Sequence, residues 1–356
     1  MDKEQGAAFL SCAGKTLTDE EKRLFEAFRP VGITLFARNI ENSGQVQKLI
    51  KQIREAADDD VLIAVDQEGG RVRRLKEPEF MAYVAQKQIG ELPLAQAKKM
   101  AKLQAELISR DLKKLGIDIN FAPVLDIMHD DTTDALRSRC FSSDVKVVGR
   151  LGKESVKTYI SSGIIPCIKH LPGHGWAVCD PHLGLPVIEK SLDELDDEFE
   201  PFRVCNFSPM GMTAHILLSK VDDKNPLTQS AKGIREIIRE KIGFGGFLIS
   251  DAIDMHALKG SVAEKAKYSL DAGCDGVCYC MGNIDEMREL VQSCPKLSDE
   301  SRQRLDKAKQ ILHNKPDSGG DEKCKQYCLM SQKVAAYDEK YDATEVLHRL
   351  QRKSQC

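Results

Sequence analysis

Two side chains suited to acid–base chemistry lie close together near the middle of the chain. Asp180 and His182 are two positions apart in the segment 169–186, which reads KHLPGHGWAVCDPHLGLP. In a tight turn, the Asp180 carboxylate can accept a hydrogen bond from the His182 imidazole, which would fix the ring's tautomer and raise its basicity. Free histidine titrates at about pH 6.5, so a histidine partnered in this way is suited to proton transfer near neutral pH.

A third candidate is a carboxylate that directly follows an apolar run. In the segment 247–255, FLISDAIDM, Asp251 is the first ionisable residue after the run. A carboxylate in such a place is costly unless it is paired or performs a function. Asp254 comes three residues later, and we expect it to cap or brace the following helix.

The same middle segment contains three of the eight histidines, which raises the alternative of a zinc site. His170 and His174 are four residues apart and would share one face of a helix. Leu171, Pro172 and Gly173 lie between them, however, and proline disfavours a helix at this position. The twelve cysteines include no CxxC pair of the kind that binds zinc. We therefore expect no metal and no organic cofactor.

Further polar residues follow two other apolar runs. The segment 65–74, VDQEGGRVRR, brings Asp66 and Arg74 to either side of Gly69 and Gly70, and two glycines allow a sharp turn of the backbone. The segment 121–141, FAPVLDIMHDDTTDALRSRCF, carries three charged residues that we expect on a long loop over the same face of the fold: Asp126, Arg137 and Arg139.

Short apolar runs throughout the chain indicate the strands that must position these residues. Several are continuously apolar, which is typical of strands buried on both faces of a parallel sheet. The eight runs are Ala8–Ala13, Gly32–Phe36, Val61–Asp66, Ile119–Leu125, Ile164–His170, Met212–Leu217, Phe247–Asp251 and Asp275–Tyr279.

Helical patterns lie between the runs. They are Leu17–Phe28, Val46–Ala57, Leu94–Leu115, Val147–Ser162, Ala231–Lys241 and Ser261–Ala272, and the first opens on a Thr-x-x-Glu capping box at Thr18 and Glu21. This alternation predicts an α/β fold with a single closed (β/α)8 barrel. The alternative is an open doubly wound sheet, but no GxGxxG follows the first strand. A barrel would gather the polar residues at the carboxyl ends of its strands.

Composition limits the remaining possibilities. The chain has 356 residues, 42% of them apolar, and a net charge of −3, which favours neither nucleic acid nor a membrane surface as a partner. The first residues lack the basic start of a signal peptide, so we expect a cytoplasmic location. We expect residues 1–314 to form the barrel and residues 315–356 to form a polar linker, 315–325, and a charged helical tail, 332–356.

Three motifs together resemble a known family. VDQEGGRV, then KHLPGHG with a downstream Asp-x-His, then ISDAIDM resemble the single-domain bacterial β-N-acetylglucosaminidases of glycoside hydrolase family 3. The similarity runs from about Leu10 to Gly282. It implies a retaining enzyme that forms a covalent glycosyl–aspartate intermediate and removes terminal N-acetylglucosamine from muropeptides during cell-wall recycling.

The resemblance also implies roles for individual residues. Asp251 stands at the position of the family's nucleophile, His182 at that of the general acid/base and Asp180 at that of the histidine's partner. Five further residues stand at positions that hold the sugar: Asp66, Arg74, Arg139, Lys169 and His170. The chain departs from the family at Pro181, where a serine is usual, and the match is weak around 130–136, close to Arg139.

Two other functions remain open at this point. Phosphorolysis uses the same first step, and a neutral histidine would not repel an approaching phosphate as a second carboxylate would. An inactive sugar-binding homologue is the other alternative, although the presence of Asp251, Asp180 and His182 together argues against it.

Overall fold

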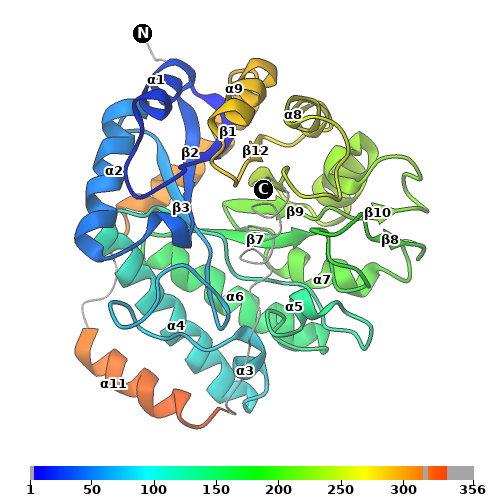
Figure 1. Ribbon diagram of the computed structural model, residues 1–356. Helices are drawn as coiled ribbons and strands as arrows, with labels where there is room; N and C mark the ends of the chain where they lie inside the picture. The colour runs from blue at the N-terminus through cyan, green and yellow to red at the C-terminus, as the bar shows by residue number, and fades with distance from the viewer. Residues whose placement is uncertain (1–3, 316–319, 335–356) are drawn as a thin grey trace.

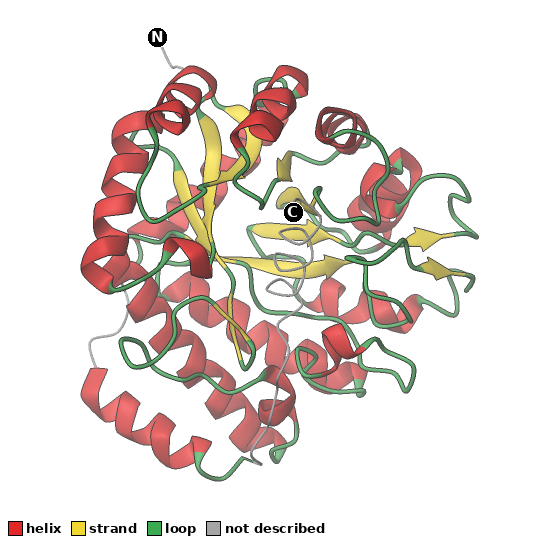
Figure 2. Cartoon of the chain, in the orientation of Figure 1, coloured by secondary structure: helices red, strands yellow, loops and turns green. Residues whose placement is uncertain are grey.

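Eight parallel strands form a closed barrel at the centre of the molecule (Figures 1 and 2). The computed structural model describes residues 4–315 and 320–334. The strands follow one another around the barrel in chain order, and the last pairs with the first. They are β1 (Gly6–Ser11), β2 (Pro30–Leu35), β3 (Leu62–Val65), β6 (Ile119–Asn120), β7 (Ile165–Leu171), β9 (Met210–Thr213), β11 (Phe247–Ala252) and β12 (Gly276–Cys278). The predicted (β/α)8 barrel is confirmed, and each predicted strand overlaps one of these.

Helices surround the barrel and connect its strands (Figure 2). The α-helices up to residue 309 are α1 (Asp19–Phe28), α2 (Ser43–Ala57), α3 (Gln86–Gly90), α4 (Leu94–Leu115), α5 (Asp134–Arg137), α6 (Val145–Ser161), α7 (Asp196–Val204), α8 (Val262–Asp271), α9 (Ile284–Ser293) and α10 (Asp299–Lys309). The helix expected at 231–241 is a π-helix, Gly233–Lys241. Single 3₁₀ turns occur at Ala37–Asn39, Leu227–Gln229 and Gln310–His313. Five of these helices were not expected from the sequence: α3, α5, α7, α9 and α10.

The first helix begins at the predicted capping box. The Thr18 hydroxyl accepts a hydrogen bond from the Glu21 amide at 3.1 Å, and the Glu21 carboxylate accepts one from the Thr18 amide at 2.8 Å. Two amide groups that the helix itself leaves unpaired are thereby satisfied.

The strands bury both of their faces, in two separate cores. Along β1, Phe9 belongs to the core inside the barrel, whereas Ala8 and Leu10 belong to the core between the strands and the helices. The inner core includes Phe121, whose ring meets Phe9 edge to face at 6.2 Å, and Met212. Burial on both faces is the reason that the strands appear in the sequence as continuous apolar runs.

A short antiparallel hairpin follows β3 and carries part of the pocket wall. Its strands are β4 (Gln67–Gly69) and β5 (Val72–Arg73). Gly69 has φ +106°, and a Cβ atom placed there would lie 2.3 Å from the carbonyl oxygen of Val84. Gly70 also has a positive φ, +58°, so the sharp turn expected at the two glycines is confirmed. A second small sheet pairs β8 (Val187–Ile188) with β10 (Leu217–Leu218).

The last described helix, α11 (Gly320–Ser331), packs against α4 on the outside of the barrel (Figure 1). The linker expected at 315–325 is therefore helical from Gly320 onward. Most of the expected tail, from residue 335 onward, lies outside the described residues, and the division of the chain at residue 314 remains a prediction. Within the described part of the chain, no helix is both long and apolar enough to cross a membrane.

Candidate active site

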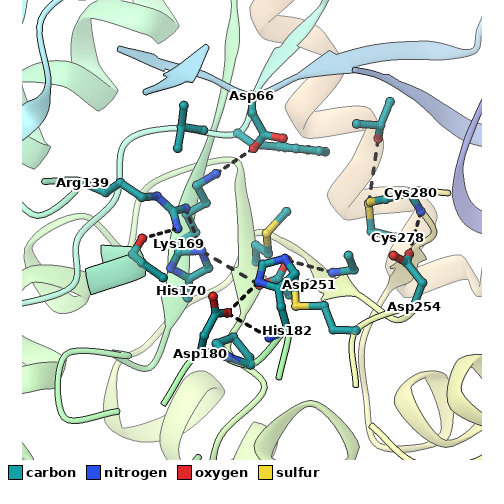
Figure 3. Close-up of a pocket in the computed structure, with 18 of the residues that line it drawn as sticks. Asp66, Arg139, Lys169, His170, Asp180, His182, Asp251, Asp254, Cys278 and Cys280 are labelled. Carbon is teal, nitrogen blue, oxygen red and sulfur yellow. Dashed lines mark hydrogen bonds and ion pairs between the residues drawn. The ribbon is translucent and has the colours of Figure 1, made fainter. Parts of the chain in front are cut away.

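A pocket opens at the carboxyl ends of the barrel strands (Figure 3). All eight residues to which the family resemblance assigns a role line it, although they come from segments as far apart as the β3–β4 junction and β11. They are Asp66, Arg74, Arg139, Lys169, His170, Asp180, His182 and Asp251. Parallel strands that end at one rim of a barrel bring these distant segments together.

Asp180 and His182 form the expected pair on the loop after β7. The Nδ1 atom of His182 lies 2.7 Å from Oδ1 of Asp180, which also accepts a hydrogen bond from the His182 amide at 2.9 Å. The loop is fastened to the segment after β11, because the Ala257 amide donates to the Pro181 carbonyl at 3.0 Å. With Nδ1 engaged by the carboxylate, Nε2 is the ring nitrogen suited to exchange a proton with a substrate.

The pair also shifts the acidity of its members. Burial disfavours the charged form of His182, but the hydrogen bond and the charge of Asp180 outweigh it and raise the pKa of His182 above its ordinary value of 6.5. The charge of Asp251 adds to this rise. Burial likewise opposes ionisation of Asp180, yet its hydrogen bonds to His182 lower its pKa. A histidine whose pKa is raised by neighbouring carboxylates retains its proton to higher pH, which suits a general acid.

Asp251 lies near the end of β11. Its Oδ1 accepts a hydrogen bond from the Ala252 amide at 2.8 Å, and its Oδ2 lies 4.0 Å from Nε2 of His170. Burial raises the cost of ionising this carboxyl group, but the neighbouring His170 and His215 outweigh burial and lower the pKa of Asp251. An ionised, largely desolvated carboxylate can act as a nucleophile.

Cations and carboxylates alternate across the opposite wall of the pocket. Lys169 lies 2.8 Å from Asp66, and Arg74 lies 3.2 Å from the other oxygen of Asp66. Burial opposes the charge of Asp66, but the adjacent Lys169 and Arg74 hold its pKa below the ordinary range. Fixed donors and acceptors of this kind are suited to neighbouring sugar hydroxyls.

Glu68 lies behind this wall, and the sequence did not point to a role for it. Its carboxylate receives two hydrogen bonds from Arg139, both at 2.9 Å, and lies 2.7 Å from Lys169. The Glu68 side chain is only 1% exposed. Burial opposes its ionisation, but Arg139 and Lys169 lower its pKa to about 2. The sequence marked Glu68 only by its place in the Asp-Gln-Glu cluster before two glycines. Because such a cluster is also typical of an exposed turn, it did not identify Glu68 as part of the site.

His170 is held by a second buried carboxylate. Asp126 is fully buried, and its Oδ2 lies 2.6 Å from Nδ1 of His170. The other oxygen of Asp126 accepts hydrogen bonds from the amides of His170 and His174, at 3.2 and 2.9 Å. Asp126 therefore sets both the position and the tautomer of the His170 ring, a role that the sequence did not reveal.

The expectation that Asp254 caps the following helix is wrong, although its charge does interact with Lys265 of α8. The cap of α8 is Ser261, whereas Asp254 lines the pocket and accepts a hydrogen bond from the Cys280 amide at 2.8 Å. The loop after β11 lies against the end of β12 before α8 begins, because the Ile253 amide donates to the Cys278 carbonyl at 2.9 Å. Burial raises the pKa of Asp254. Asp254 thus lies with Cys278 and Cys280 on the side of the pocket away from Lys169 (Figure 3).

The local geometry at His170 and His174 differs from the one that the zinc alternative requires. No helix forms there, because His170 belongs to β7 and a turn follows it. The two rings meet edge to face at 5.8 Å. Burial lowers the pKa of His174 to about 4, so its ring is neutral. Among the described residues, no group of three or more histidines, cysteines or carboxylates is placed to hold a metal ion.

The pocket combines a carboxylate, a proton donor and polar groups that suit several sugar hydroxyls. This combination on a barrel is typical of enzymes that cleave glycosidic bonds. Comparison with known proteins agrees. Residues 5–314 match the model of the glycosyl hydrolase family 3 N-terminal domain. The chain belongs to glycoside hydrolase family 3. Its prediction as a glycoside hydrolase is thus confirmed.

Individual relatives support this placement over most of the chain. A β-hexosaminidase of Bordetella avium is 33% identical, across 84% of this chain and 88% of the relative. Among solved structures, NagZ from Neisseria gonorrhoeae in complex with N-trifluoroacetyl-D-glucosamine superposes with a TM-score of 0.79 at 31% identity, over 92% of this chain and 96% of that one. A family 3 β-N-acetylglucosaminidase from Paenibacillus gives a TM-score of 0.83 at 27% identity, over 95% and 70% of the two chains.

Proposed function

We propose that this protein is a retaining β-N-acetylglucosaminidase that removes terminal β-linked N-acetylglucosamine. The observation that carries the proposal is the presence in one pocket of an ionised strand-end carboxylate, Asp251, and a hydrogen-bonded Asp180–His182 pair. The names of its relatives, β-hexosaminidase and β-N-acetylglucosaminidase, support the choice of sugar.

In the first step, a carboxylate oxygen of Asp251 attacks the anomeric carbon while Nε2 of His182 gives its proton to the departing glycosidic oxygen. This forms a covalent glycosyl–aspartate and releases the aglycone. In the second step, His182 takes a proton from water, the water oxygen attacks the same carbon, and the bond to Asp251 breaks. Two inversions give net retention of configuration.

The alternating wall has a positioning role in this mechanism. Asp66, Arg74, Lys169 and Arg139 would bind the hydroxyl and N-acetyl groups, and His170 would contact the sugar between this wall and Asp251. Holding the anomeric carbon near the nucleophile replaces a random encounter by an oriented one.

For the natural substrate, we propose a muropeptide derived from peptidoglycan, processed in the cytoplasm during cell-wall recycling. The support is the likeness to NagZ across nearly the full length of both chains. The test is release of N-acetylglucosamine from purified N-acetylglucosaminyl muropeptides, with chitobiose as the comparison. Efficient cleavage of chitobiose with no cleavage of muropeptides would contradict this substrate.

The reaction itself is tested with an aryl N-acetyl-β-glucosaminide, with and without inorganic phosphate. Hydrolysis predicts free N-acetylglucosamine at a rate that phosphate does not increase. Formation of N-acetylglucosamine 1-phosphate, with a rate that rises with phosphate, would instead establish the phosphorolysis alternative. Absence of turnover together with retained binding of N-acetylglucosamine would indicate a sugar-binding protein.

A further inference from the structure

The C-terminal helix α11 lies outside the segment matched by the family model, yet one of its side chains reaches the support of the active site. Tyr327 is buried, with 1% of its surface exposed. Its ring packs edge to face against Tyr83, with the centroids 5.6 Å apart. Around it, Lys323 pairs with Glu106 of α4 at 2.8 Å, and Cys324 accepts a hydrogen bond from Arg110 at 3.0 Å. The helix is therefore fixed in place on α4.

The hydroxyl group of Tyr327 joins two parts of the chain. It accepts a hydrogen bond from the Val84 amide at 2.8 Å and donates one to Oε1 of Gln104 at 2.7 Å. The amide nitrogen of Gln104 in turn donates to the backbone carbonyls of Glu68, at 3.2 Å, and Val84, at 3.1 Å. Tyr327 is thus one side chain removed from the backbone of Glu68.

Glu68 belongs to the hairpin β4–β5, which is flanked by two of the proposed sugar ligands, Asp66 and Arg74. The carboxylate of Glu68 holds Lys169 and Arg139. The hairpin is supported from below by segment 83–85, because the Gly70 amide donates to the Tyr83 carbonyl at 2.8 Å. Loss of the hydrogen bond between Tyr327 and Gln104 would loosen the hairpin at Glu68. The hairpin orients four polar side chains of the pocket: Asp66, Arg74, Lys169 and Arg139.

We infer that Tyr327 is a positioning residue, which acts through Gln104 and the backbone of Glu68 to hold the sugar-binding hairpin in its binding geometry. The inference rests on the proposed assignment of the alternating wall to sugar binding. It gives the C-terminal helix a part in the active site, although none of its described residues lines the pocket.

The test compares Tyr327→Phe with Tyr83→Phe, using the full-length chain. Each variant removes one buried hydroxyl and keeps its ring, but Tyr83 donates to Asp111 and not to the hairpin support. Because a hydrogen bond contributes a few-fold to an equilibrium, we expect Tyr327→Phe to raise the KM for an aryl N-acetyl-β-glucosaminide by about three- to tenfold. The inhibition constant of N-acetylglucosamine should rise by the same factor, and kcat should stay within about twofold.

A purely structural role would give a different result. Partial unfolding lowers the amount of active enzyme and so lowers the apparent kcat, while KM stays constant. A reduced Tm with an unchanged KM in Tyr327→Phe would therefore overturn the inference. An equal rise of KM in Tyr83→Phe would also overturn it, since the effect would then be a general loosening of this region.

Gln104→Met provides a second, independent variant, because it removes the bridge from its other side. It should raise KM as Tyr327→Phe does, and the double variant should show no further rise, since both changes break the same connection. Fully additive effects on KM would contradict the bridge.

Asp66→Asn serves as the reference for the wall itself. If Asp66→Asn leaves KM and kcat unchanged, the sugar assignment fails; if it impairs binding and Tyr327→Phe does not, only the role of Tyr327 fails.

Discussion

Glu68 and Arg139 form a two-point ion pair beneath the pocket wall, with both of its hydrogen bonds at 2.9 Å. The two residues are 71 positions apart, and Lys169 approaches the same carboxylate from a third segment at 2.7 Å. One buried carboxylate thus fixes two cations that we assign to the sugar.

This relationship predicts a combined loss of binding and stability in Glu68→Gln. Arg139 would lose its hydrogen-bonded carboxylate and Lys169 would keep only Asp66, and breaking a buried ion pair costs about 3–5 kcal/mol. We expect a lower Tm by calorimetry and a raised KM. Glu20→Gln breaks an exposed pair with Arg288 and serves as the control, which should change neither quantity. An unchanged KM in Glu68→Gln would show that Arg139 and Lys169 do not bind the sugar.

Asp251→Ala should abolish turnover while leaving the fold intact, because it removes the proposed nucleophile. We expect a loss of at least about 10⁴-fold in kcat, as for nucleophilic and charge-partner residues in other hydrolases. Mass spectrometry after treatment with a 5-fluoro N-acetylglucosaminyl donor should find the label on the peptide containing Asp251. Asp254→Asn is the matched control and should still be labelled at Asp251. A label on any other residue would refute the assignment.

His182→Ala should impair substrates with poor leaving groups most, because these need a proton as the bond breaks. General acid assistance is typically worth about 10²–10⁴-fold. Activated aryl glycosides should lose much less in their first step. Asp180→Asn should give a milder loss, since the ring remains. The measurement is the rate across a series of phenols of increasing pKa. Equal losses for good and poor leaving groups would exclude His182 as the acid.

The pH dependence of kcat/KM should reflect the two shifted groups. Asp251 must be ionised, and its pKa is lowered, so activity should fall only at distinctly acidic pH. His182 must be protonated, and its pKa is raised, so the alkaline decline should lie above the ordinary histidine range. Asp180→Asn removes the charge that raises the pKa of His182 and should move the alkaline decline to lower pH. An unmoved decline would contradict this account; Asp193→Asn, at an exposed site, is the control.

Activity should not depend on a metal ion. The His170–His174 segment forms a strand and a turn, and the described residues contain no candidate metal cluster. Dialysis against EDTA should leave kcat and KM unchanged. A large loss that zinc restores would support a metal site after all.

The strands were largely predictable because burial on both faces produces continuous apolar runs. The ends of the strands were less predictable than their positions. Strand β6 was expected to extend to Leu125 but stops at Asn120. Pro123 follows shortly after, and it has no amide hydrogen to donate to a neighbouring strand. Helix α7 was missed since Pro201 lies within it, a position where proline normally argues against a helix. Its burial of Phe199 and Phe202 outweighs that preference.

The site was predictable where chemistry is local and unpredictable where it depends on tertiary contacts. The Asp180–His182 pair spans two residues, so its hydrogen bond follows from spacing alone. The partners of Glu68 lie 71 and 101 positions away, and no local pattern distinguishes such a residue from an exposed one. The same holds for Asp126, whose partner His170 lies 44 positions away.

Phe121, Met212 and Cys278 belong at once to the inner core of the barrel and to the lining of the pocket. The side chains at the floor of the pocket are thus also the last layer of the core inside the barrel. A smaller side chain there would enlarge the pocket and also leave a void in the barrel, which lowers stability. The loop that carries Arg139 is free of this double constraint, because its pocket-lining residues Ala135, Leu136 and Arg139 lie outside the inner core. New substrate preferences in this fold should therefore arise through changes in its loops, while the floor stays nearly constant.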